Sequence, residues 1–105
     1  MKINLLATKI TLTPAISQYV QTKMDMLEKF LGNTPVINCD VEVSKVGGEQ
    51  AKGDIFKTEV NLSIPGTLLR VEKKASDLYK SIDKVKDHLA EVIVQHREKK
   101  RDQKR

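Results

Sequence analysis

The sequence of 105 residues predicts one α+β domain with the element order β-α-β-β-β-α, a four-stranded mixed sheet with two helices packed side by side on one face. Two segments, 15–31 and 76–96, repeat apolar residues every three or four positions, which is the spacing of one helix face. Between them, three segments alternate apolar and polar residues, as half-buried strands do. The length suits one domain with a single core.

A short strand over 2–10 is predicted first, because Ile3, Leu5 and Ala7 share one face of it. Thr13 is a suitable N-cap for the following helix, and Pro14 is a suitable first helical residue because its missing N–H would have no partner there. The helix continues to residue 31 and carries an apolar stripe of Ile16, Val20, Met24, Leu27 and Leu31.

Gly32-Asn33 and Pro35 end this helix, since glycine favours the left-handed cap and proline prevents a continuation. A strand follows over 37–44, with its buried side formed by Ile37, Cys39, Val41 and Val43. A glycine-rich connection over 47–53 leads to a second strand at 56–64, so these two strands form a hairpin. The turn dipeptide Pro65-Gly66 then predicts a third antiparallel strand over 67–74.

The last helix starts at Ser76, a suitable N-cap, and Asp77 meets the positive end of the helix dipole. Its apolar stripe consists of Leu78, Ile82, Val85, Leu89, Val92, Ile93 and His96. We therefore expect one domain over 1–96. Residues 97–105 hold six basic and two acidic side chains, a net charge of +4, and are expected to be a basic extension of the helix that is disordered until RNA orders it. A right-handed crossover between the first two strands would place the two helices side by side.

The formal charge of +5 and the pI of about 9.4 favour an anionic partner such as nucleic acid. Aromatic residues are few, at 4% with no Trp, so phosphate and shape recognition fit better than base stacking. No apolar run reaches the roughly 20 residues of a membrane span, and no signal peptide is recognised, so a cytoplasmic protein without membrane contact is expected. Cys39 stands alone and is expected to be a buried thiol.

The sequence lacks the motifs of common catalytic sites, namely a glycine-rich phosphate loop, paired cysteines and a nucleophile elbow. His88 and His96 are about 12 Å apart along one helix, too far to share a metal ion. Ser76 and Asp77 have a capping explanation, and Asp83 is expected to face solvent. We therefore expect a non-enzymatic protein with no metal, no cofactor and no small-molecule substrate, monomeric when free.

Basic residues remain as candidate binding groups. Lys23 and Lys29 flank the stripe of the first helix, and a polar ridge on the last helix consists of Lys80, Lys84, His88, Glu91 and Gln95. A solvated helix face is the simpler explanation of such a ridge. However, Lys80 and Lys84 are like-charged and lie one turn apart, which favours an anionic partner. Together with the tail, these groups would form one electrostatic footprint if the helices are adjacent.

The run Ala-Ser-Asp-Leu-Tyr-Lys-Ser-Ile-Asp at 75–83 resembles the signature that opens the last helix of the ribosome hibernation promoting factors and the related ribosome-associated inhibitor A. Segments 13–16 and 27–30 are similar to the ends of that family's first helix, and 64–72 is similar to its last turn and strand. The resemblance spans nearly the whole chain, and the short form of the family is the better match. It implies the same β-α-β-β-β-α fold.

The resemblance also implies a factor that binds the small ribosomal subunit at the decoding region and inhibits translation under stress or in stationary phase, by blocking the messenger and transfer RNA sites. Lys80 and Lys84 are this sequence's own additions, whereas His88, Glu91 and Gln95 replace basic residues of the family. The expected rRNA-binding residues are Lys23, Lys29, Lys74, Lys80, Lys84, His88, Arg97, Lys99, Lys100 and Arg101. The alternatives are a general structured-RNA-binding module resembling a double-stranded RNA-binding domain, and a regulator that binds proteins through its sheet.

Overall fold

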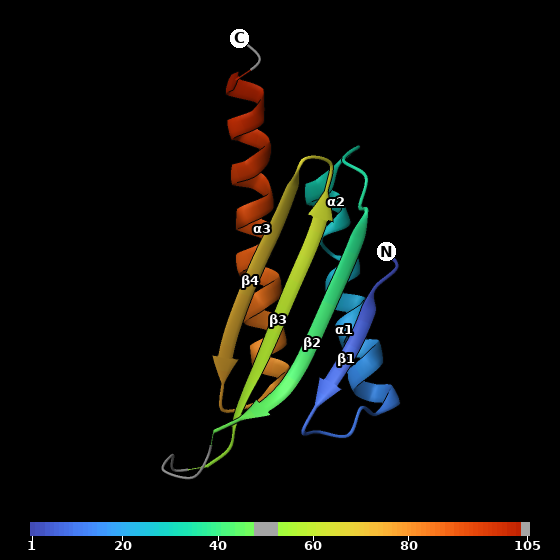
Figure 1. Ribbon diagram of the computed structural model, residues 1–105, viewed down its shortest axis with the longest axis vertical. Helices are drawn as coiled ribbons and strands as arrows, with labels where there is room; N and C mark the ends of the chain where they lie inside the picture. Colours follow the sequence, from blue (N-terminus) through green and yellow to red (C-terminus); the bar gives the residue numbers. More distant parts are fainter. Residues whose placement is uncertain (48–52, 104–105) are drawn as a thin grey trace.

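The computed structural model describes residues 1–47 and 53–103. The elements are, in order, β1 (Asn4–Thr8), α1 (Pro14–Asp25), α2 (Glu28–Leu31), β2 (Asn38–Val46), β3 (Ile55–Ile64), β4 (Thr67–Ala75) and α3 (Leu78–Gln103). The strands form one sheet in the order β1-β2-β3-β4, with β1 parallel to β2 and the other neighbours antiparallel. The helices lie on one face of this sheet, and α3 continues past the turn between β3 and β4 (Figure 1). The predicted fold class is confirmed.

The core lies between the helices and one face of the sheet. Strand residues alternate in direction, so one face of β2, β3 and β4 supplies apolar side chains to it. Helix α3 contributes five of the seven residues of the predicted stripe, whereas Val92 and His96 are only half-buried. The buried apolar residues are Val20, Met24, Leu27, Leu31, Cys39, Val41, Val43, Val60, Leu62, Ile64, Leu69, Val71, Leu78, Ile82, Val85, Leu89 and Ile93. Cys39 is fully buried, so the expected buried thiol is confirmed, and this burial raises the pKa of the thiol to about 11.

One buried polar contact fixes the position of α3 on the sheet. The Ser81 hydroxyl donates to the Leu78 carbonyl oxygen at 2.7 Å, so it accepts from Thr58 on β3, also at 2.7 Å. Thr58 and Ser81 are both fully buried, and a partner lost there would leave a polar atom without a hydrogen bond. The contact therefore holds α3 at one place along the sheet.

The helix predicted over 15–31 is divided in two. Helix α1 ends at Asp25, and the next turn tightens, because the Leu27 N–H donates to the Met24 carbonyl oxygen at 3.0 Å. The single turn of α2 then ends at Gly32, which has a positive φ of 58°. Apolar spacing did not reveal this break, because Leu27 and Leu31 stay buried on both sides of it.

Two predicted boundaries are also corrected. Ile37 was expected to be buried in a strand, but β2 starts at Asn38 and the Ile37 side chain is 68% exposed, although its N–H still donates to the Ser63 carbonyl oxygen of β3 at 2.8 Å. The N-cap of α3 is Asp77 rather than Ser76, because the Asp77 side chain accepts from the Lys80 N–H at 3.1 Å. The Thr13 cap is confirmed, since its hydroxyl accepts from the Ile16 N–H at 3.2 Å. Part of the glycine-rich connection, 48–52, lies outside the described residues.

Candidate nucleic-acid interface

A groove between β4 and α3 brings together three of the predicted binding residues. It has a volume of about 550 Å³ and is lined by Lys73, Lys74, Lys84, Asp87, His88 and Glu91. Lys84 and His88 lie one helical turn apart on the flank of α3 that faces β4. Lys73 was not predicted. Its position at the end of an edge strand, beside the start of α3, was the signal in the sequence that could have revealed it.

The charge of this groove is moderately positive. Three lysines and two acids line it, a net charge of +1 with His88 neutral. Asp87 is already paired, because its carboxylate lies 2.7 Å from the Lys86 ammonium. Lys74 and Lys84 form no ion pair with any other described residue, so their ammonium groups remain available to an anion.

Lys23 belongs to α1, which packs on the other flank of α3, and its ammonium group is already engaged in an ion pair. Its ammonium is 3.2 Å from the Asp83 carboxylate and 5.3 Å from the centre of the Tyr19 ring. The Tyr19 hydroxyl donates to the same carboxylate at 2.6 Å. Asp83 was expected to face solvent, but it links α1 to α3 through these contacts. The carboxylate offsets the charge of Lys23, which reduces its value for binding phosphate.

The protonation of this cluster follows from its contacts. Burial raises the pKa of Asp83, but the Tyr19 hydroxyl and the Lys23 ammonium outweigh burial and hold this pKa below its usual value. The hydrogen bond to Asp83, followed by burial, raises the pKa of Tyr19 to about 12. Tyr79 packs edge-on against Tyr19, with ring centres 4.8 Å apart. These contacts hold α1 and α3 together, and we call this cluster the clamp; it consists of Tyr19, Lys23, Tyr79 and Asp83.

Arg97 also has a structural partner. Its Nη1 donates to the Phe30 carbonyl oxygen at 2.6 Å and so caps the end of α2. The guanidinium lies so close to Gly32 that a Cβ there would be 2.9 Å from Nη2. The ammonium group of Lys29, the other cation of this region, lies 5.1 Å from the centre of the Phe30 ring.

The predicted cations therefore fall into separate groups rather than one footprint. Lys74, Lys84 and His88 share the groove beside β4, and Arg97, Lys100 and Arg101 line a second cavity near the end of α3. Lys23 and Lys29 belong to α1 and α2, on the other side of α3 from the groove. Lys80 and Lys99 are exposed but line neither cavity.

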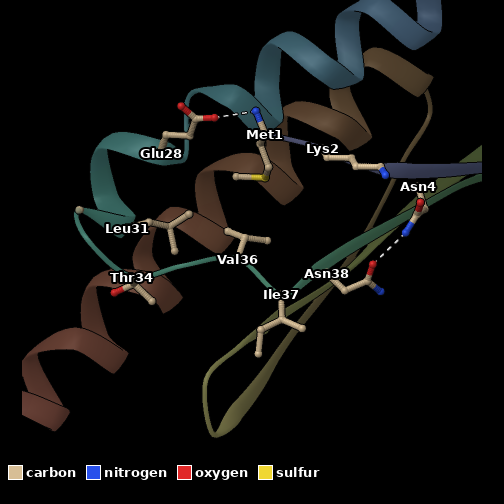
Figure 2. A pocket seen from close by; sticks show the side chains of 10 residues that line it. Met1, Lys2, Asn4, Glu28, Leu31, Thr34, Val36, Ile37 and Asn38 are labelled. Carbon is tan, nitrogen blue, oxygen red and sulfur yellow. Dashed lines mark hydrogen bonds and ion pairs between the residues drawn. The ribbon is translucent and has the colours of Figure 1, made fainter.

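A further cavity, of about 560 Å³, lies between the start of β1 and the loop after α2 (Figure 2). Met1, Leu31 and Val36 form its apolar side. The Met1 ammonium is held by the Glu28 carboxylate at 2.6 Å and the Asp25 carboxylate at 2.9 Å. These polar groups satisfy one another, and none of them forms a nucleophile and base pair. The cavity therefore offers no recognisable catalytic arrangement.

Residues 1–47 and 53–103 also contain no recognisable metal site and no membrane-spanning helix. No group of three His, Cys, Asp or Glu side chains in these residues is placed to hold a metal ion. In the same ranges, no helix is long and apolar enough to cross a membrane.

The fold defines a class of α+β domain that is known from solved structures. The chain resembles the N-terminal domain of Thermus thermophilus Protein Y with a TM-score of 0.77 and 28% identity, over 91% of this chain and 99% of that one. It also shares the fold of a ribosomal subunit interface protein from Coxiella burnetii, with a TM-score of 0.74 and 15% identity, over 92% and 98% of the two chains.

The chain belongs to the Sigma 54 modulation protein / S30EA ribosomal protein family, whose model matches residues 3–101. It is 31% identical over 99 residues to the ribosome hibernation promotion factor of Picosynechococcus sp., which covers 94% of this chain and 50% of that protein. It is 25% identical over 99 residues to the ribosome hibernation promoting factor of Klebsiella oxytoca, covering 94% and 96%. The chain thus spans about half the length of the first relative and nearly all of the second.

Proposed function

We propose that the protein is a ribosome hibernation factor of the cytoplasm. It binds the small ribosomal subunit at the decoding region and inhibits translation under stress or in stationary phase, by occupying the sites of messenger and transfer RNA. The proposal is supported by the family match and by the names of the two relatives. The structural observation that carries it is the groove beside β4, where Lys74 and Lys84 present ammonium groups that no described acid pairs.

The binding mode follows from the distribution of charge. Cations on α3 and β4 neutralise rRNA phosphates, and each neutralised phosphate releases counterions. The folded body, with a longest dimension of 52 Å, supplies shape recognition in a cleft. Lys23 and Arg97 contribute less than the sequence suggested, because Asp83 and the Phe30 carbonyl oxygen already engage them. Lys74, Lys80, Lys84, Lys99, Lys100 and Arg101 are the principal contacts.

Co-sedimentation with small ribosomal subunits at several salt concentrations tests this function. If about six phosphates are neutralised, the logarithm of the binding constant falls by about 4 to 5 per unit of log salt. A binding constant that does not change with salt concentration, or the absence of binding, would refute the proposal. Free duplex RNA serves as competitor: equal affinity for it would favour a general RNA-binding module.

Charge reversal locates the contacts. The variant Lys74→Glu/Lys84→Glu changes the groove, and Lys2→Glu/Lys9→Glu is the matched control with the same net charge, at exposed positions before and after β1. We expect the first variant to lose at least tenfold in affinity and the control to stay within threefold. Equal losses would mean that overall charge, rather than this groove, determines binding.

A further inference from the structure

The second cavity of α3 lies where this helix passes the end of the sheet. The loop after α2 and the turn between β3 and β4 meet α3 there and enclose about 440 Å³. This volume falls within the range of small-molecule sites in proteins. The lining residues are Asn33, Thr34, Pro35, Ile64, Pro65, His96, Arg97, Lys100 and Arg101.

One wall of the cavity is cationic. Arg97 and Arg101 are four residues apart, as are His96 and Lys100, so they form two neighbouring rows on the side of α3 that faces the cavity. The bond from Arg97 to the Phe30 carbonyl oxygen fixes its guanidinium at the wall. Lys100 and Arg101 are exposed at the mouth and have donors to offer an anion.

The rest of the lining comes from the loop after α2 and the turn between β3 and β4, and part of it is apolar. Pro35, Pro65 and Ile64, the last only 3% exposed, are its apolar members. Asn33 and Thr34 add an amide and a hydroxyl, each of which can both donate and accept a hydrogen bond. A planar ring with polar edges would contact the prolines and bond with these groups at the same time.

We propose that this cavity is a binding site for a single phosphorylated nucleotide. Its phosphate lies against Lys100 and Arg101, and its base lies against Pro35 and Pro65. A phosphate alone would use one wall and an apolar ring alone the other, whereas a nucleotide matches both. The nucleotide comes either from an RNA strand, in which case the site deepens the proposed function, or from the free pool.

The test is a titration of the full ¹⁵N-labelled chain, followed by NMR at constant ionic strength. The probes are inorganic phosphate, adenosine and adenosine 5′-monophosphate. We expect the monophosphate to shift the amides of Asn33, Thr34 and His96 and to bind at least tenfold more tightly than either other probe. Equal affinity for phosphate and the monophosphate, or shifts spread evenly along α3, would overturn the proposal, because they indicate only a charged surface.

Variants of exposed residues sharpen the result without changing the core. Lys100→Gln/Arg101→Gln is expected to weaken binding of the monophosphate at least tenfold, and the control Lys2→Gln/Lys9→Gln, at exposed positions and with the same change of charge, less than twofold. Equal effects of the two pairs would overturn the site. The helix content of each variant is checked by circular dichroism.

A short single-stranded RNA then identifies the source of the nucleotide. Displacement of the monophosphate by the RNA supports an RNA nucleotide as ligand, and RNA binding elsewhere without displacement supports a free nucleotide. Both results require the site, and they differ only in its occupant. Since the titration contains no ribosomes, its failure is distinct from a failure of co-sedimentation.

Discussion

The clamp between α1 and α3 gives the most direct test of the structure, through the substitution Tyr19→Phe. This change removes one hydroxyl and keeps the ring that packs on Tyr79. The lost hydrogen bond is 2.6 Å long and ends on a carboxylate. Bonds to charged groups contribute about 1.5 to 3 kcal/mol. Because the Asp83 side chain is 41% exposed, solvent screening reduces this contribution, and we expect a loss of about 1 kcal/mol.

Urea denaturation followed by circular dichroism measures this loss. With an m-value of about 1 to 1.5 kcal/mol/M, the midpoint should fall by about 0.7 to 1 M. The matched control is Tyr79→Phe, which makes the same chemical change in the other ring of the pair. The Tyr79 hydroxyl has no side-chain hydrogen bond to another described residue, so its loss should change the midpoint by less than about 0.3 M. Equal effects of the two substitutions would refute the clamp.

The pH dependence gives a second readout of the same contact. The pKa of Asp83 lies below its usual value in the folded protein, so its contribution to stability is complete above the unfolded pKa of about 4. It disappears as the pH falls through the lower, folded pKa. The difference between Tyr19→Phe and wild type should therefore shrink below about pH 4. In an alkaline absorbance titration, Tyr19→Phe should remove the tyrosine that ionises at about pH 12.

Two further substitutions and one measurement of thiol reactivity test the packing. Leu89→Ala should lower the free energy of unfolding by about 2 to 5 kcal/mol in urea denaturation, because Leu89 is fully buried; a loss below about 1 kcal/mol would contradict this core position. Gly32→Ala should lower it by about 1 to 2 kcal/mol, because alanine is strained at this positive φ and its Cβ would displace the Arg97 guanidinium from the Phe30 carbonyl oxygen. Gly66→Ala, also at a positive φ, has open space, and equal losses would mean that backbone strain alone acts. Cys39 should react with a thiol reagent at pH 8 about a hundredfold more slowly in the folded than in the denatured protein, and comparable rates would contradict a thiol pKa of about 11.

The fold was predictable because its signals are periodic. Apolar spacing of two or of three to four residues defines which face of an element is buried, and the buried stripe of α3 agrees with it from Leu78 to Ile93. Boundaries were less predictable. The break between α1 and α2 involves no glycine or proline, and it leaves Leu27 and Leu31 on the buried side, so the pattern of burial is the same with and without it.

The candidate site was less predictable for a different reason. A basic residue has the same appearance in sequence whether it is free or paired, and the partners here are distant along the chain. Lys23 meets Asp83, 60 positions later, and Arg97 meets the Phe30 carbonyl oxygen, 67 positions earlier. Periodicity along one helix carries no information about such pairs. The groove beside β4 likewise depends on how α3 lies against the sheet, which brings Lys73 next to Lys84.

In the segment 75–83, which indicated the family, most residues have structural roles in the fold rather than exposed positions suited to binding. Asp77 caps α3, and Leu78 and Ile82 enter the core. Ser81 bonds to Thr58, and Asp83 closes the clamp with Tyr19. Each of these roles needs a particular residue type at a fixed position, which makes the segment recognisable in sequence. Lys80 lies among them, exposed and without such a constraint. Under the proposed function, Lys80 and Lys84 contact phosphates through long side chains that can reach a phosphate from more than one position along the helix, so these two positions need no fixed neighbour in the fold.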